Sequence, residues 1–220
     1  MRTIVLFLLS LGAFASDPFR LAKSEMQNGN YIYSLVILRN IKGNNQVLSQ
    51  RYFLEGMCYS QVGDHSKSIS KFIEANKLNP SIPDYFYEFG KGLYFAKELE
   101  RAKKSFLTSI KKNSQVTGSL FYLAKIAKTQ KEFRQAKVYI KQILAIKNLN
   151  PRVTQDALYQ LGDIHLKISK NELKPEDMKP IVSKHVLPYY ENALRTLPTS
   201  ENSKKIQERV ELIKKKYDLL

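Results

Sequence analysis

The feature that most constrains this sequence is a 34-residue period centred on residues 51–80. Gly56 is followed by Gly90, and Phe72 by Phe106, each 34 residues further along the chain. Each period holds two stretches with helical spacing of apolar residues, separated by a turn signal such as Gly63-Asp64. Periods of this length are typical of stacked helical hairpins, which bury their apolar faces against one another. The sequence therefore predicts an all-α repeat protein.

The spacing within the period resembles the tetratricopeptide repeat (TPR). When repeat positions are counted from Ser49, the motif residues stand at positions 4, 8, 11, 15, 20, 24, 27 and 32: Tyr52, Gly56, Tyr59, Gly63, Ser68, Phe72, Ala75 and Pro80. The resemblance implies a right-handed superhelical solenoid of about five TPR helical hairpins plus a C-terminal capping helix. It also implies a scaffold that holds partners.

The period divides residues 16–199 into five units: 16–48, 49–82, 83–116, 117–150 and 155–199. The fifth unit contains an insertion near 170–184, rich in Lys, Glu and Pro, which predicts a loop or a broken helix. Such an insertion either contributes to binding or is a tolerated loop. Pro188 predicts that the following helix starts or kinks there. Residues 200–220 predict an amphipathic helix that caps the stack or, alternatively, lies on a membrane surface.

Residues 1–15 differ in kind from the rest of the chain. A short positive start is followed by the apolar run Ile4–Leu11 and by Ala13-Phe14-Ala15, whose small-x-small spacing suits signal peptidase. The run is shorter than the roughly 18 residues that span a bilayer, so we expect a cleaved signal peptide rather than an anchor. The expected location is periplasmic or otherwise extracytoplasmic, with no transmembrane segment in the mature form.

The formal net charge is +16, and residues 101–150 contain twelve Lys or Arg against the single acid Glu132. A basic surface attracts nucleic acid, anionic lipid and acidic proteins alike. Since an exported protein rarely meets nucleic acid, we expect an acidic protein partner, with contact to an anionic envelope surface as an alternative.

Residues that could perform chemistry are scarce. Cys58 is the only cysteine and falls at a packed repeat position, which favours a buried, inert thiol. The chain has no phosphate loop, nucleophile elbow or metal-binding motif, and Asp163 and His165 point in different directions on a helix. We therefore expect no catalytic residues, no metal site, no cofactor and no enzymatic activity.

The TPR resemblance implies that the first helices of successive repeats line a concave groove. Repeat position 5 is aromatic in every unit, which is compatible either with packing against neighbours or with a ladder of rings for a bound peptide. Lysines interleave with these rings and suit acidic side chains. The expected groove residues are Phe53, Met57, Tyr87, Lys91, Tyr94, Phe121, Lys125, Lys128 and Tyr159.

These observations favour a non-enzymatic adaptor of the bacterial cell envelope that binds an acidic and apolar peptide or helix in its groove. The alternative is a basic protein that docks on anionic lipid or cell-wall polymer. Lys103, Lys104, Lys111 and Lys112 would carry that second activity, since we expect them on a second helix and away from the groove.

Overall fold

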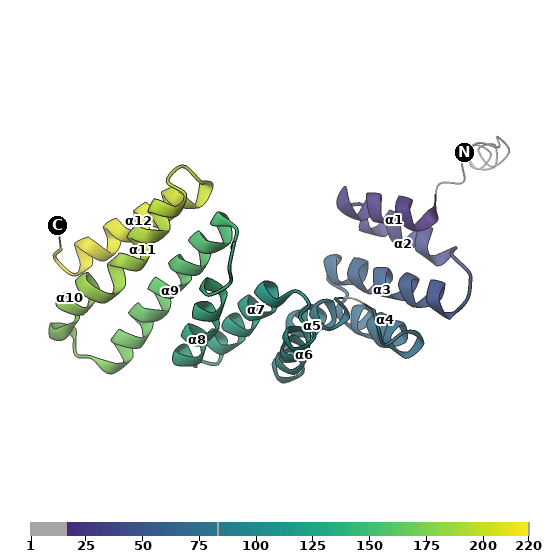
Figure 1. Ribbon diagram of the computed structural model, residues 1–220, viewed down its shortest axis with the longest axis horizontal. Helices are drawn as coiled ribbons and strands as arrows, with labels where there is room; N and C mark the ends of the chain where they lie inside the picture. Colours follow the sequence, from purple (N-terminus) through teal and green to yellow (C-terminus); the bar gives the residue numbers. More distant parts are fainter. Residues whose placement is uncertain (1–16, 83, 220) are drawn as a thin grey trace. The chain divides into compact units, whose positions relative to one another are not determined.

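Every regular element of the part that the structure describes, residues 17–82 and 84–219, is helical (Figure 1). The structure is a computed structural model. The predicted all-α repeat fold is confirmed. The predicted signal peptide, residues 1–15, lies outside the described residues.

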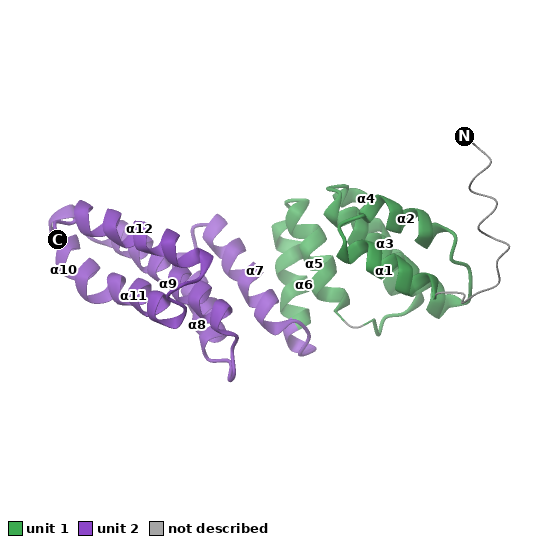
Figure 2. Cartoon of the chain, turned by 90° about the horizontal axis from the view of Figure 1, so that it is seen from above, with its two compact units in different colours: residues 1–109 green, residues 110–220 purple. Residues whose placement is uncertain are grey.

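The helices form two compact units, residues 1–109 and 110–220, each described here by itself (Figure 2). The helices of unit 1, the last of which ends just beyond the boundary, are α1 (Pro18–Gln27), α2 (Tyr31–Arg39), α3 (Asn45–Gln61), α4 (His65–Leu78), α5 (Tyr85–Phe95) and α6 (Leu99–Lys111). Those of unit 2 are α7 (Val116–Thr129), α8 (Phe133–Leu144), α9 (Pro151–Glu172), α10 (Met178–Ile181), α11 (Leu187–Thr196) and α12 (Glu201–Lys216).

The turns inside the hairpins share a left-handed backbone conformation. Gly29 and Gly63 have φ of 80° and 82°, and Lys97 and Lys131 take the same conformation in the next two hairpins, at 65° and 62°. This conformation costs a residue with a side chain about 1–2 kcal/mol, whereas glycine adopts it freely. Packing of the two helices therefore sets the turn even where the sequence offers lysine.

Within each hairpin, repeat position 8 faces position 24. A Cβ atom on Gly56 would lie 2.9 Å from the ring of Phe72, and one on Gly90 would lie 2.8 Å from the ring of Phe106. Where position 24 is aliphatic, position 8 is alanine: Ala22 with Leu38, and Ala124 with Ile140, are all buried. The small residue thus leaves the space that the larger partner fills.

Glu55 is an exception among the buried residues of unit 1, because it is 2% exposed and charged. Its carboxylate lies 2.6 Å from Lys71 Nζ and 3.6 Å from Arg51 Nε. Both cations also lie over the ring of Tyr52, at 4.7 Å and 4.5 Å from its centroid. Two cations thus compensate a carboxylate that would otherwise be costly to bury.

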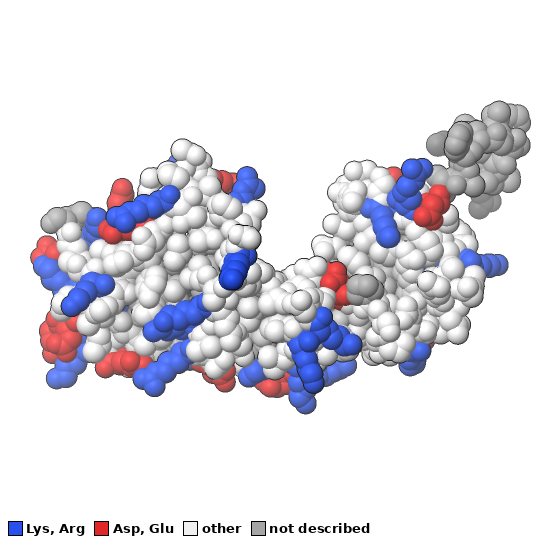
Figure 3. Space-filling view, viewed as in Figure 1, with Lys and Arg blue, Asp and Glu red and all other residues white. Residues whose placement is uncertain are grey.

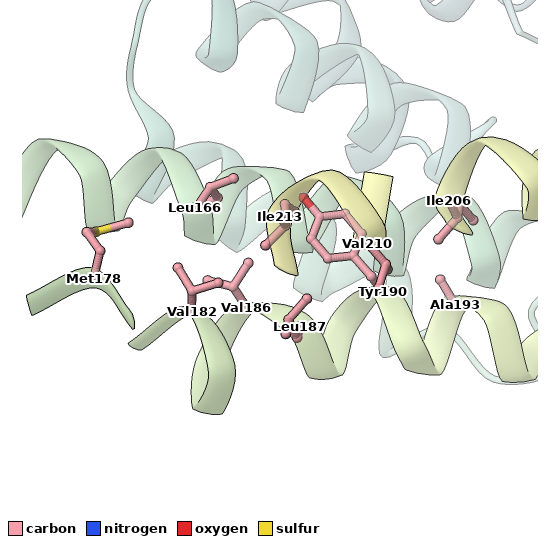
Figure 4. Close-up of a cluster of buried hydrophobic side chains, with 10 residues drawn as sticks. All are labelled: Leu166, Met178, Val182, Val186, Leu187, Tyr190, Ala193, Ile206, Val210 and Ile213. Carbon is pink, nitrogen blue, oxygen red and sulfur yellow. The ribbon is translucent and has the colours of Figure 1, made fainter. Parts of the chain in front are cut away.

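The insertion in the fifth hairpin is a broken helix packed into the core of unit 2, rather than a loop. After α9, a 3₁₀ turn (Pro175–Asp177), α10 and a π turn (Val182–Val186) lead into α11. Met178, Val182 and Val186 are buried together with Leu166 of α9 (Figure 4). Helix α11 starts at Leu187 with Pro188 in its first turn, where a missing N–H is tolerated.

Helix α12 covers this same core with one apolar stripe: Ile206, Val210 and Ile213 are buried against α11 and α9 (Figure 4).

A buried amide, that of Gln155, joins helices α9, α11 and α12. Gln155 Nε2 donates to the backbone oxygens of Ala193 (3.1 Å) and Leu197 (2.9 Å). In return, Ser200 Oγ donates to Gln155 Oε1 at 2.6 Å. Gln155 therefore fixes both ends of the α11–α12 connection to α9.

Candidate functional site

Side chains at repeat position 5 of the first helices are all half-buried: Phe19, Phe53, Tyr87, Phe121 and Tyr159. Three of them contact the aromatic residue at position 24 of their own hairpin. The ring centroids lie 5.6 Å apart for Phe53–Phe72, 6.1 Å for Tyr87–Phe106 and 5.7 Å for Tyr159–Tyr190. Each of these rings is therefore held in place by packing on one side, and part of its surface stays open to solvent.

In unit 1 a cleft of about 380 Å³ opens between α1 and α3. Met57 and Leu54 of α3 form one wall, while Met26 and Lys23 of α1 form the other; Gln27, Tyr31 and Gln61 complete the lining. Lys23 is the charged residue of this lining. The cleft thus offers an apolar floor, formed in part by two flexible methionines, beside a cation.

The third hairpin contributes Tyr87, Lys91 and Tyr94 on α5. Lys91 Nζ lies 2.9 Å from a carboxylate oxygen of Glu88 and 5.2 Å from the centroid of the Tyr87 ring. Tyr94 packs edge-on against Phe95, with centroids 5.5 Å apart. Lys91 lies over the Tyr87 ring, and its charge is compensated within its own helix.

The fourth hairpin belongs to unit 2, so its residues are described apart from those of α5. Lys125 of α7 is exposed and lies 5.0 Å from the centroid of the Tyr122 ring. Lys128 is half-buried and donates to Gln160 Oε1 of α9 at 3.0 Å. Burial lowers the pKa of the Lys128 ammonium. Lys125 therefore presents its charge to solvent, whereas Lys128 serves mainly to join α7 to α9.

Two carboxylates on α9, those of Asp156 and Asp163, lie on the face of unit 2 that also carries Lys128. Asp156 accepts a hydrogen bond from Gln160 Nε2 at 2.9 Å. Asp163 accepts from the Tyr190 hydroxyl at 2.6 Å and from Arg209 of α12 at 2.9 Å. Sequence reasoning missed the contacts of Gln160 with Lys128 and of Arg209 with Asp163, since each joins residues that are far apart in the chain. The face is consequently a mixture of charges and not uniformly basic.

Charged side chains elsewhere on the surface are also interspersed with uncharged area (Figure 3). Lys104 and Lys111 of α6 are exposed, as is Lys112 just after it, while Lys103 is half-buried. These lysines therefore lie on or next to a second helix, where a basic flank was expected.

The histidines occupy separate environments. His65 stacks on Phe95 at 5.6 Å, and His165 packs against Tyr189 at 4.7 Å between centroids. Burial, followed by the nearby charges of Lys137 and Lys141, lowers the pKa of His165 to about 4. In residues 17–82 and 84–219, the structure brings no three His, Cys, Asp or Glu side chains into a metal-binding cluster.

No protein-family profile matches this sequence, and no curated protein matches it. Several solved structures are similar in fold. RapI in its apo form is 15% identical and superimposes with a TM-score of 0.66, over 90% of this chain and 57% of RapI. MamA (41-end) from Desulfovibrio magneticus RS-1 is 14% identical, with a TM-score of 0.62 over 86% of this chain and 99% of MamA. PilF from Pseudomonas aeruginosa is 18% identical, with a TM-score of 0.55 over 87% and 96% of the two chains.

Proposed function

We propose, from the tetratricopeptide-repeat fold that this chain shares with RapI, MamA and PilF, that it is a non-enzymatic scaffold for protein–protein interactions. At these identities the likeness concerns the fold, so the proposal depends on the surface of this chain itself. Its partner is a peptide or helix that lies along the first helices of the hairpins.

The observation that carries the proposal is the half-buried ring at repeat position 5. Such a ring is rigid because one side packs on the second helix, as in Phe53–Phe72 and Tyr87–Phe106. Rigid aromatic side chains bind with little loss of conformational entropy and are enriched among residues that dominate binding energy. A series of them on successive first helices suits an extended or helical partner.

The chemistry expected of the partner follows from the apolar and positively charged side chains that the first helices carry besides the rings. The cleft between α1 and α3 accepts an apolar side chain, because Met26, Leu54 and Met57 line it, and Lys23 favours a carboxylate beside that side chain. Lys125, exposed on α7, adds a second cation. We infer that the partner carries both apolar and acidic side chains.

The proposed place of action is the bacterial cell envelope. This part of the proposal depends on the sequence of residues 1–15, with its apolar run Ile4–Leu11 and small residues at Ala13 and Ala15. Among the described residues, no helix is both long enough and apolar enough to cross a bilayer. A mature protein that begins at Ser16 is the expected product of export.

Photocrosslinking at single positions tests the scaffold proposal. A photoreactive phenylalanine analogue replaces Tyr87 or Tyr159 in one set of variants, and Leu107 or Val138 in the control set. The control residues are 45% exposed apolar side chains on the second helices α6 and α8. We expect the same envelope protein to crosslink to Tyr87 and Tyr159 variants but not to the controls. Crosslinks at the control positions alone would contradict the proposal.

A further inference from the structure

The second helix of the first hairpin, α2, has an apolar outer face. Ile32, Tyr33 and Val36 on this face are 64%, 55% and 50% exposed. On the opposite side of α2, Ser34, Leu35 and Leu38 are buried. The helix is thus apolar on nearly all sides, although only one side packs against the protein. Helices of this kind usually bury the second side against a binding partner or a membrane.

The repeat itself shows that this face is unusual. The residues at the same repeat positions 34 and 68 residues later are exposed as well, but all are polar or charged: Ser66, Lys67, Ser70, Glu100, Arg101 and Lys104. The fold therefore places these positions on the surface of a hairpin without requiring apolar side chains there. Packing within unit 1 does not account for Ile32, Tyr33 and Val36.

Leu21 of α1 is a further exposed apolar residue of the first hairpin. It stands at repeat position 7 and is 39% exposed, whereas its equivalents Leu123 and Leu161 are 1% and 2% exposed. Within the described part of unit 1, α1 and α2 form the end of the stack (Figure 1). We define Ile32, Tyr33 and Val36 of α2 as the α2 patch.

The charges around the α2 patch are mainly positive. Residues 17–42 contain Arg20, Lys23, Arg39 and Lys42 against Asp17 and Glu25. Both acids are engaged inside the hairpin: Asp17 accepts from Phe19 N at 3.0 Å, and Glu25 accepts from Asn30 Nδ2 at 2.8 Å. All four basic residues are exposed, although Arg39 also donates to the Tyr59 hydroxyl at 2.8 Å and Lys23 lines the cleft between α1 and α3. An apolar face with a basic border suits an anionic lipid surface.

The size of the α2 patch favours lipid over a second copy of the chain. A wholly buried aromatic side chain covers only about 150–250 Å². Three half-exposed side chains therefore fall short of the roughly 800 Å² that each partner buries in a stable protein interface. Insertion into a lipid headgroup region needs only a few apolar side chains together with basic residues.

We propose that the first hairpin docks on an anionic lipid bilayer through the α2 patch, with Tyr33 at the level of the headgroups and Ile32 and Val36 against the acyl chains. The α2 patch lies on a second helix, so this activity is separate from binding on the first helices and does not depend on it.

The test attaches an environment-sensitive dye to the mature chain, which begins at Ser16, at Ile32→Cys or, as the matched control, at Ser66→Cys. Position 66 is the equivalent of position 32 in the next hairpin and is also exposed. The native Cys58 is 0% exposed, and burial raises the pKa of its thiol, so the dye reacts with the introduced cysteine. Both proteins lack residues 1–15, so vesicle binding through that apolar segment cannot produce a shift at either position.

With vesicles of phosphatidylcholine and phosphatidylglycerol, we expect a blue shift of the dye at position 32 and none at position 66. Adding Tyr33→Ser and Val36→Ser should weaken the vesicle affinity of the labelled chain at least about fivefold, since apolar burial is lost. The control pair Leu107→Ser and Val138→Ser should leave it unchanged. Equal shifts at both positions, or no shift at either, would overturn the proposal. A concentration-dependent shift at position 32 without vesicles would assign the patch to a second copy instead.

Discussion

Gly162 of α9 lies against the ring of Tyr190 in α11: a Cβ atom on the glycine would come within 2.9 Å of that ring. Gly56 and Gly90 meet Phe72 and Phe106 in the same way. The first pair is 28 residues apart and the others are 16 apart, so the difference measures the insertion as twelve residues. The hairpin geometry is preserved although the connection between its helices is longer.

Gly162→Ala should destabilise the protein by about 1–3 kcal/mol, because the added methyl group overpacks against Tyr190. This cost outweighs the gain of about 1 kcal/mol that alanine brings to a helix interior. The same substitution in a Tyr190→Ile background should cost less, since Ala124 and Ile140 already form that combination in the fourth hairpin. Chemical denaturation of the four proteins checks this, and equal costs in both backgrounds would contradict it.

Ala102 of α6 is 0% exposed, as repeat position 20 requires, and Lys111 at the end of the helix is exposed. Ala102→Leu should lower the free energy of unfolding by about 1–3 kcal/mol through overpacking. Lys111→Ala should change it by less than about 0.5 kcal/mol. If thermal melts ranked these two variants in the opposite order, the assignment of repeat positions would be wrong.

Much of the fold could be predicted because the pairing of small and large residues repeats at a fixed distance. Other features depend on contacts between distant residues that follow no period. Glu55 stands where leucine or phenylalanine stands in other hairpins, and only the structure shows Lys71 and Arg51 beside it. The core position of Met178 and Val182 was equally hidden, since a segment rich in Lys, Glu and Pro resembles a loop. At the candidate site, the rings could be found from the sequence but the hydrogen bond of Lys128 to Gln160 could not.

Gln155→Leu should loosen the C-terminal end of the protein. The substitution keeps the volume but leaves the backbone oxygen of Ala193 without its side-chain donor, and a buried unsatisfied group costs about 1–3 kcal/mol. The oxygen of Leu197 loses the bond from Gln155 but keeps the one from Ser203 Oγ. Hydrogen exchange should therefore accelerate in α12 more than in α7 or α8. The control Gln142→Leu, at an exposed position of α8, should leave exchange in α12 unchanged. Uniform acceleration across unit 2 would argue against a local role for Gln155.

His165 should make stability depend on pH between about 6.5 and 4. Its folded-state pKa of about 4 lies below the ordinary value of 6.5, so the unfolded chain takes up the proton first as the pH falls. Stability is therefore fully present above pH 6.5 and is lost as the pH drops towards 4. We expect a loss of about 1–2 kcal/mol, less than the full shift implies because the ring is only half-buried. The variant His165→Phe, which retains a ring against Tyr189, should lose less stability over this range; identical pH profiles would refute the assignment.

The central claim is that the first helices bind the partner, and the affinity of single variants for the crosslinked partner tests it most directly. Phe121→Ala should weaken binding by about 2 kcal/mol or more if the ring anchors the partner. Lys125→Glu should slow association and reduce its dependence on salt, since this lysine presents its charge to solvent. Circular dichroism must show intact helices, and Val138→Ala on α8 should bind like the parent protein. Folded Phe121→Ala and Lys125→Glu variants that bind the partner with unchanged affinity and association rate would contradict the claim.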